Sequence, residues 1–565
     1  MNDMVNAAAA AGPSEHPSVL DVIGISIIRR PESTFTIEEP SRRASSERIQ
    51  DGPVDTGSKD SAYPSGSRFY AALFLLVSVS LTGGLDLGIV AITIPTLTDE
   101  FHSLNDIGWY STALRLVSCS FMFLFSKAYT LFSTKWLMMT SLAIVSTGLL
   151  LSTFAQSSSM FILGRAVSGL GQAGMWQGYF TIFTSSFPLV RRPFIGGLLG
   201  GIETIANTSA PLLGGALIDG WTWRACFGLT VPLHLAGIVV ACLYFDQDAR
   251  NSDMSMSFWQ KTGRLDLLGS AAFVPAISCL LIGLQWGGTR YGWSDWRIIL
   301  LLILFTLLIA MFGYLQYRAK ENASLPLRIL ANRSLVAGTF FCACANGTLA
   351  VTEYYMAIYF QGVRGKSASQ AGVFALPMII GLCVSCILAG SGTSLIGYYV
   401  PFMYVTTILG PISAGLLTTI DPSTNLVKLC AILALVGIAC GAGIQAPQIA
   451  AQTVLKEQDV ATGWAIVQFG SQMGPVIFTS ASAALFLNRL SAEIMKFAPG
   501  TNITEIENAG LADVRKVVGS ARLERVLAGY DEAVVQTLYL PVALTCLTLF
   551  STLAMEWRSV KKKPD

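Results

Sequence analysis

Apolar stretches long enough to cross a bilayer follow one another along most of the chain. A transmembrane helix needs about 20 mostly apolar residues, and fourteen segments of this kind can be delimited. They cover residues 69–97, 107–126, 136–155, 160–183, 194–217, 225–245, 266–287, 297–317, 335–361, 370–390, 397–419, 426–450, 464–487 and 535–556. A soluble domain could not bury so much apolar surface. The pattern therefore predicts an all-α, polytopic membrane protein with fourteen spans.

Polar segments at the two ends and near the C-terminus complete the expected topology. Residues 1–68 are rich in Ser, Pro, Ala and Glu without periodicity, as in disordered tails, and residues 557–565 are basic. Lys and Arg concentrate in alternate loops, which places both termini in the cytoplasm. The long loop 488–534 then lies outside the cell, where Asn502, in the sequon Asn-Ile-Thr, is a candidate for glycosylation.

Composition excludes several other classes of protein. Charged residues make up 13% of the chain and the net charge is +2, so nothing indicates binding to nucleic acid. No GxxxxGK[ST] loop for ATP, HExxH motif or histidine cluster for a metal is present. The three histidines, His16, His102 and His234, form no catalytic constellation with a nucleophile. We therefore expect no cofactor, no metal and no enzymatic activity.

Short motifs stand on several of the predicted helices. They are Gly84-Leu-Asp86 in the first helix, Gly164-Arg165-Ala-Val-Ser-Gly169-Leu-Gly171 in the fourth, Pro211-Leu-Leu-Gly214-Gly215 in the fifth, Tyr359-Phe360-Gln361 in the ninth and Gln445-Ala-Pro447-Gln448 in the twelfth. Together they resemble the major facilitator superfamily, specifically the 14-span drug:proton antiporter family of fungi. The resemblance extends over nearly everything but the N-terminal tail.

The resemblance implies an architecture and a function. Two six-helix bundles, 69–245 and 335–556, would flank a linker, 246–334, that contains two extra membrane helices. The family exports small organic molecules, often toxins or secondary metabolites, in exchange for protons. Transporters built from repeated bundles place the substrate near the membrane midplane between the halves.

Five ionisable residues fall within predicted spans. Each costs roughly 2.5–3.5 kcal/mol at a helix centre, so each should have a partner or a function. They are Asp86, Arg115, Arg165, Glu203 and Glu353. Asp86 and Arg115 lie about 16 and about 12 Å below the same membrane surface, counted at about 1.5 Å per residue. We predict that these two side chains pair, either as part of proton coupling or as a fixed link between two helices.

The remaining ionisable residues have similarly divided roles. The family resemblance links Arg165 to proton coupling, in which a permanently charged guanidinium can tune a carboxylate but cannot release the proton itself. Glu203 and Glu353 are candidate proton sites, or partners in interhelical hydrogen bonds. His234 has the right chemistry for proton exchange, but a single histidine near a helix end is also common as a structural residue.

Polar, aromatic and small residues suggest a cavity and close helix contacts. Five amides that would be costly in lipid could line a central cavity or join helices by hydrogen bonds: Gln445, Gln448, Gln452, Gln468 and Gln472. Trp176, Tyr355 and Phe360 could offer aromatic surface to flat substrates. Gly169, Gly171, Gly214 and Gly215 would let helices approach closely, with Pro211 as a bend.

These observations lead to one functional prediction. The protein is expected to be a monomeric, proton-coupled exporter of small organic molecules in the cell membrane, working by alternating access. Its partners would be the substrate, protons and the lipid bilayer. The alternative is an uptake or vacuolar transporter for siderophores or basic amino acids. Either mechanism requires that the buried ionic side chains face a watery passage between two bundles.

Overall fold

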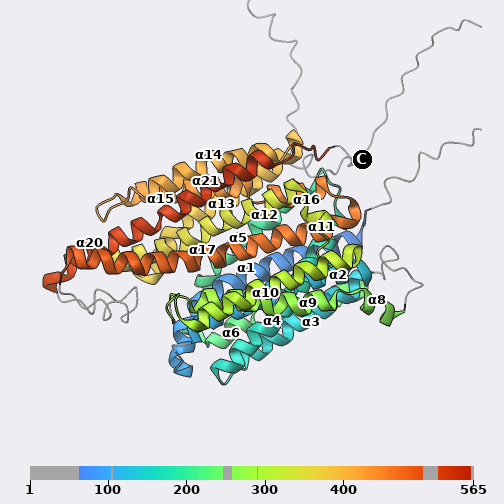
Figure 1. The fold of residues 1–565 in the computed structure, drawn as a ribbon, viewed down its shortest axis with the longest axis horizontal. Helices are drawn as coiled ribbons and strands as arrows, with labels where there is room; N and C mark the ends of the chain where they lie inside the picture. The colour runs from blue at the N-terminus through green and yellow to red at the C-terminus, as the bar shows by residue number, and fades with distance from the viewer. Residues whose placement is uncertain (1–62, 104–105, 246–256, 289, 500–519, 562–565) are drawn as a thin grey trace, which may run out of the picture. The chain divides into compact units, whose positions relative to one another are not determined.

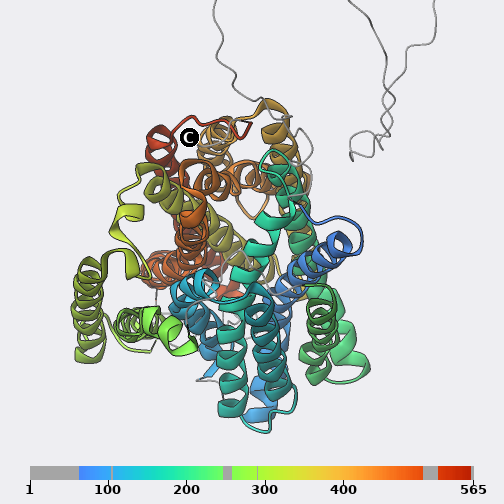
Figure 2. The same cartoon turned by 90° about the vertical axis from the view of Figure 1, so that its right-hand side faces the viewer.

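The computed structural model describes residues 63–103, 106–245, 257–288, 290–499 and 520–561, all within one compact unit. Regular structure in these ranges is helical, apart from two isolated β-bridges. The long helices run side by side in one general direction (Figure 1), and Figure 2 shows the same helices turned by 90°. Most of the predicted N-terminal tail, the first part of the linker and the Asn502 sequon lie outside the described residues.

Every one of the fourteen predicted ranges contains a helix. The first seven helices are α1 (Ser67–Phe101), α2 (Ile107–Leu131), α3 (Thr134–Thr153), α4 (Ser158–Ser186), α5 (Arg192–Gly220), α6 (Trp223–Gly228) and α7 (Val231–Tyr244). The next are α8 (Phe258–Arg264), α9 (Leu267–Trp286), α10 (Trp296–Ala319), the 3₁₀-turn η4 (Lys320–Asn322) and α11 (Leu327–Leu330). The last are α12 (Arg333–Ile358), the π-turn η5 (Tyr359–Val363), α13 (Ala368–Ile396), α14 (Val400–Leu417), α15 (Leu426–Gly443), α16 (Ala446–Val454), the 3₁₀-turn η6 (Glu457–Asp459), α17 (Val460–Phe497), α20 (Ser520–Thr537) and α21 (Tyr539–Ala554).

Local sequence explains where several helices begin. Ser157, Asp266 and Asn332 each accept a hydrogen bond from a backbone N–H in the first turn of α4, α9 and α12. Several predicted spans are interrupted, and two of the interruptions, between α6 and α7 and between α15 and α16, precede a proline. Pro232 and Pro447 lie in the first turn after each interruption, where a missing N–H costs nothing.

In the described part of the chain, ten helical segments are long and apolar enough to cross a membrane. The helices α2, α4, α5 and α17 are not among them. They carry polar and small residues, such as Arg115 on α2, Gln172 on α4 and Gln468 on α17. Such residues are tolerated where a helix faces other helices or a cavity rather than lipid. The lower hydropathy of these four helices is consistent with their extensive contacts with neighbouring helices.

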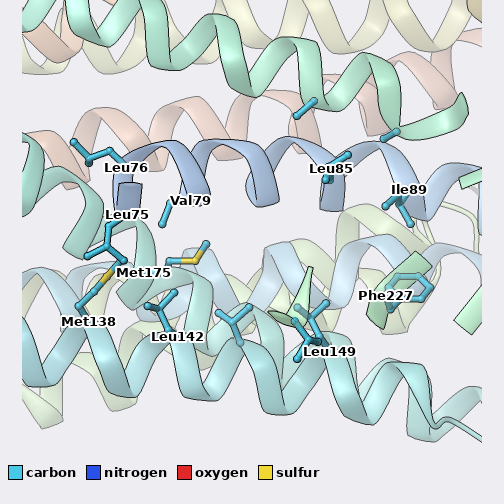
Figure 3. Packing of buried hydrophobic residues seen from close by; sticks show 14 of the residues in the cluster. Leu75, Leu76, Val79, Leu85, Ile89, Met138, Leu142, Leu149, Met175 and Phe227 are labelled. Atoms are coloured by element: carbon cyan, nitrogen blue, oxygen red, sulfur yellow. The ribbon is translucent and has the colours of Figure 1, made fainter. Parts of the chain in front are cut away.

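The helices pack in two groups. In the first group, α1 packs on α5 and α7, and α4 packs on α2 and α3; in the second, α12 packs on α17 and α21, and α15 packs on α13 and α14. Figure 3 shows the core of the first group, where Leu75 and Val79 of α1 meet Leu142 of α3 and Met175 of α4. Each group thus has its own apolar core.

The helix pair α9 and α10 lies beside both groups. The helix α9 packs on α2 of the first group and on α17 of the second, and α10 packs on α9. Most of α10 is exposed, as expected for a helix surrounded by lipid. Asp266 fixes the pair, since its carboxylate accepts hydrogen bonds from Gln316 of α10 and from the backbone N–H of Ser324.

The two ends of the helix bundle can be distinguished by their contacts. Phe69 at the start of α1 packs edge-on against Phe187 beyond α4. The backbone N–H of Phe194 donates to Ser394 near the end of α13, and Gly397 accepts from Val560. The first and last described helices therefore begin and end on one side, which we call the proximal end. The opposite side is called the distal end.

The predicted distal loop 488–534 is largely helical at its flanks, which corrects the expected span boundaries. The helix α17 continues to Phe497, and α20 already begins at Ser520. The two extensions pack together, and Gln536 donates to Glu493 at 3.1 Å. The sequence shows a helical pattern across residues 509–530 of this loop, and α20 is helical from Ser520 on. The apolar stretches alone do not include these amphipathic segments, which is why the predicted spans are shorter than the helices.

A charged contact at the distal end fastens α1 to α6. Glu100 accepts hydrogen bonds from the Trp223 indole and from Arg224, whose nearest nitrogen lies 2.7 Å away. The hydrogen bond from Arg224, the one from Trp223 and the Arg224 charge hold the pKa of Glu100 below its ordinary value of 4.5, against a smaller opposing effect of burial. The contact therefore stabilises the fold above about pH 4.5 and loses this effect as the pH falls through the lowered value.

Replacing Glu100 with Gln should lower the thermal unfolding temperature slightly at pH 7. The pair is partly exposed, so the loss should correspond to a few tenths of a kcal/mol. The difference from wild type should be smaller at acidic pH, because Glu100 becomes neutral as the pH falls through its lowered pKa. Thermal unfolding in detergent at both pH values measures this, with Asp99→Asn as the control. An equal deficit at pH 7 and pH 3.5 would show that charge plays no part.

Candidate functional site

A cavity of about 340 Å³ lies between the two helix groups. Its wall comes from α1, α2, α4 and α5 of the first group and from α12, α13, α16 and α17 of the second, together with Ile444 and Gln445 between α15 and α16. The polar part of the wall includes residues that the sequence predicted and others that it did not. From the predicted set, Arg115, Glu203, Glu353, Gln445, Gln448, Gln452, Gln468 and Trp176 line the cavity.

Three of the five predicted ionisable residues face this cavity. Arg115 on α2 and Glu353 on α12 come from different groups and are close enough to interact electrostatically. They do not form a salt bridge at contact distance. Glu203 on α5 stands apart from them, with Tyr179 and Cys386 among its neighbours. Among the described residues, Glu203 forms no ion pair.

The amide side chains serve both predicted roles. Gln445 reaches across to α5 and donates to the carbonyl of Gly196 at 3.1 Å, and Gln452 accepts from Arg192 at 3.1 Å. Gln448 donates to Gln468 at 3.4 Å. These four amides line the cavity and also join helices. Gln472 is not among the residues of the wall.

Two of the predicted aromatic residues lie elsewhere. Tyr355 and Phe360 are almost fully buried in the core of the second group, where Tyr355 packs against Phe486 and Phe360 against Phe374. The prediction that they contact substrate is therefore not supported by their positions. Trp176 is correctly placed, and Phe180, Phe183 and Trp464 add aromatic surface to the same wall.

Asp86 does not pair with Arg115, so that prediction is wrong. Its Oδ1 accepts from Arg165 at 2.5 Å, and its Oδ2 accepts from Gln172 at 2.9 Å. Both charged partners are buried, with 9% of Asp86 and 2% of Arg165 exposed. Equal depth in the membrane did not decide the pairing, because the face of α1 that carries Asp86 points at α4.

The ion pair is separate from the cavity. Neither Asp86 nor Arg165 lines the cavity, although Leu87, the next residue of α1, does. Arg165 also donates through Nε to the carbonyl of Tyr110 at 3.3 Å. The expectation that all buried ionic side chains face one passage therefore holds for Arg115, Glu203 and Glu353 but not for Asp86 and Arg165.

Predicted small residues lie at close helix contacts. A Cβ atom on Gly169 would come within 3.0 Å of the Leu114 backbone, and one on Gly171 within 2.5 Å of the Val145 backbone. A Cβ on Gly214 would meet Ile92 at 2.9 Å, whereas Gly215 has ordinary contact distance to the same side chain. Pro211 lies inside α5, which remains helical around it. Gly169 and Gly171 thus let α4 pack directly on α2 and α3.

Direct contacts between the two groups lie in the proximal half of the helices. Phe180 stacks on Trp464 with ring centroids 4.5 Å apart, and Gln177 donates to the carbonyl of Ala461. Nearby, a Cβ atom on Gly197 of α5 would come within 2.8 Å of the Cys386 carbonyl on α13. These contacts, with those of Gln445 and Gln452, join the two groups on the proximal side of the cavity.

Several polar residues of the site were missed from the sequence. Gln172, Asn207 and Asn346 are amides on α4, α5 and α12. Helical spacing could have found them, because residues four or seven apart share a face. Gln172 follows Arg165 by two turns, Asn207 follows Glu203 by one turn, and Asn346 precedes Glu353 by two turns.

The fold and the cavity together define a membrane transporter: two packed helix groups enclose a polar, partly charged cavity between them. The family model described as Major Facilitator Superfamily matches residues 76–479. The chain belongs to this superfamily.

Several fungal proteins are similar to this chain over most of their length. The "MFS-type efflux pump MFS1" of Trichophyton rubrum is 37% identical over 86% of this chain and 91% of its own length. The "MFS-type transporter astH" of Aspergillus oryzae is 35% identical over 93% of both chains. The "Efflux pump aflT" of Aspergillus parasiticus is 34% identical over 90% of this chain and 99% of its own length.

Solved structures share the fold at low sequence identity. The human organic anion transporter MFSD10 (TETRAN) superposes with a TM-score of 0.53 at 11% identity, covering 85% of this chain and all of that one. A bacterial homologue of the human lysosomal transporter Spinster, in an inward-facing and unoccupied conformation, gives 0.52 at 14% identity, covering 87% and 98%.

Proposed function

We propose that this protein exports small organic molecules from the cell in exchange for protons. The single observation that supports this most is Glu203, a carboxyl group without an ion-pair partner among the described residues, in a cavity that both helix groups line. A group in that position can lose or gain a proton as the substrate enters or leaves. The efflux pumps among the fungal relatives favour export over uptake.

Substrate transport is coupled to proton movement if substrate binding and protonation of Glu203 affect each other. A substrate that occupies the cavity beside Glu203 favours one protonation state of the carboxyl group, and by linkage that protonation state changes the affinity for the substrate. Arg115 and Glu353 contribute to the same balance, since neutralising Glu353 would leave the guanidinium of Arg115 without its opposite charge. Asp86 and Arg165 act at a distance from the cavity.

The arrangement of contacts supports alternating access. With both termini in the cytoplasm, as the loop charges indicate, the proximal side, on which contacts join the two groups, faces the cytoplasm. Export would then require that the contacts of Gln445, Gln452 and the Phe180–Trp464 stack break to admit substrate from within. The bundles would be 69–245 and 335–556, and the protein would work as a monomer in the cell membrane.

The substrate can be identified by comparing metabolite levels in cells with and without the gene. Deleting the gene should raise the intracellular level of a metabolite and lower its level in the medium. Everted membrane vesicles should then accumulate that metabolite when their lumen is acidic, at least about ten-fold faster than without a pH gradient. Accumulation at the same rate with and without a pH gradient would contradict proton-driven transport. Loss of the metabolite from the vacuole would contradict export across the cell membrane.

A further inference from the structure

The ends of α8 and α10 come together at the proximal end of the bundle. The helix α8 is held there by Phe258, which packs against Phe132 just beyond the end of α2, with ring centroids 5.8 Å apart. The last turn of α10 is held there by Gln316, which donates to Asp266 at the start of α9. Figure 1 shows α8 at this end of the bundle. The last turns of α8 and α10 are therefore neighbours.

Four cations at these two helix ends have exposed or half-exposed side chains: Lys261 and Arg264 on α8, and Arg318 and Lys320 at the end of α10. Among the residues that the structure describes, none of these four side chains forms an ion pair or a hydrogen bond. The nearest acidic residue in the sequence, Asp266, does not neutralise them. Its carboxylate accepts three hydrogen bonds within the protein, from Gly269, Gln316 and Ser324. The positive charge of this surface is therefore uncompensated.

Large apolar side chains accompany these cations and are open to the exterior. Trp259 is 79% exposed, Leu268 75% and Tyr317 70%. The guanidinium of Arg318 lies over the Tyr314 ring, 5.9 Å from its centroid. A surface that is both apolar and cationic is complementary to a phospholipid. Its aromatic rings suit the boundary between headgroups and acyl chains, and its cations suit the phosphate.

The opposite, distal end of the same helix pair is built differently. Arg290 lies over the Trp286 ring at 5.7 Å, and Arg297 lies over the Tyr291 ring at 4.7 Å. Both distal arginines therefore have a ring partner within the protein. Among the proximal cations in the described part of the chain, only Arg318 has one. The cations that are left for an external anion thus concentrate at the proximal end.

We propose that this proximal surface binds an anionic phospholipid whose phosphate lies between the ends of α8 and α10. Arg264 and Arg318 share the phosphate, and the acyl chains lie along α10, most of which is exposed. The lipid then links α8 to α10 and holds the helix pair at the membrane surface. The loop charges predict a cytoplasmic proximal end, and the cytoplasmic leaflet carries the anionic lipids. The inference does not depend on the proposed transport function.

Lipid titration of the delipidated, full-length protein tests the surface. Native mass spectrometry measures the binding of phosphatidylserine and of phosphatidylcholine with the same acyl chains. The wild type should bind phosphatidylserine at least about five-fold more tightly, because each cation near the headgroup favours a net negative charge. In Arg264→Gln/Arg318→Gln this preference should fall below about two-fold. Equal binding of the two lipids by the wild type would overturn the proposal.

The distal end of the same helix pair provides the matched control. Arg290→Gln/Arg297→Gln removes as many arginines as the proximal variant and should retain the preference for phosphatidylserine. An equal loss in both variants would show that overall charge attracts the lipid, and it would refute a site at the proximal surface. If Arg264→Gln/Arg318→Gln does not fold, Lys261→Gln/Lys320→Gln makes the same comparison on the same surface.

Thermal unfolding in detergent distinguishes a lipid from a free anion. Phosphatidylserine should raise the unfolding temperature of the wild type, and this effect should be smaller in Arg264→Gln/Arg318→Gln and at high salt. Inorganic phosphate at the same concentration should leave the unfolding temperature unchanged, because it has no acyl chains to contact α10. Equal stabilisation by inorganic phosphate would identify a free anion as the ligand and would overturn the proposal of a lipid site.

Discussion

Replacing Arg165 with alanine should prevent most of the protein from folding. The substitution leaves the carboxylate of Asp86 charged, buried and without its ion-pair partner. Breaking a buried pair in this way costs about 3–5 kcal/mol, a large fraction of the stability of an ordinary domain. The yield of monodisperse protein in detergent and its thermal unfolding temperature should both fall sharply. Arg333→Ala, which breaks an exposed pair with Glu556, is the matched control and should change little.

The double variant Asp86→Asn/Arg165→Leu separates folding from function. It removes both charges, so no unpaired ion stays buried, and its stability should return close to that of wild type. The amide oxygen introduced at position 86 can still accept the hydrogen bond that Gln172 donates. Transport driven by a pH gradient should nevertheless remain absent if the ion pair takes part in proton coupling. A single variant Arg165→Ala as stable as wild type would contradict a stabilising role of the Asp86–Arg165 ion pair.

Apolar periodicity was sufficient to predict the helical architecture. Each predicted span contains a helix because long apolar runs have few alternatives in a membrane. The same criterion failed at α17 and α20, whose extensions beyond Leu487 and before Val535 are amphipathic and pack on each other. A search for apolar runs therefore ends where such amphipathic segments begin, although the helices continue.

The candidate site was predicted only in part. Depth along a helix follows from counting residues, and this count placed Asp86 and Arg115 at similar depths. The direction in which a side chain points depends on the rotation and tilt of its helix. For that reason, the sequence paired Asp86 with Arg115 rather than with Arg165, and it assigned Tyr355 to the cavity rather than to the core.

Replacing Glu203 with Gln should uncouple transport from the proton gradient. Glutamine has nearly the shape of the protonated glutamic acid and cannot release a proton. If Glu203 carries the exchanged proton, the variant should still bind substrate and exchange it across the membrane when substrate is present on both sides. Accumulation driven by an acidic vesicle lumen should fall at least about ten-fold. The measurements are gradient-driven uptake and substrate exchange without a gradient, both with rhodamine 6G in everted vesicles.

The comparison between these two rates makes the result specific. Loss of both rates would mean that Glu203 binds the substrate or maintains the structure of the cavity, in addition to any role as the proton carrier. Full gradient-driven accumulation in the variant would show that another group carries the exchanged proton, either Glu353 or the buried Asp86. Glu100→Gln makes the same chemical change outside the cavity and should retain both rates. Because Glu203 has no ion-pair partner among the described residues, its neutralisation leaves no opposite charge exposed, so a selective loss of gradient-driven uptake reports proton coupling rather than misfolding.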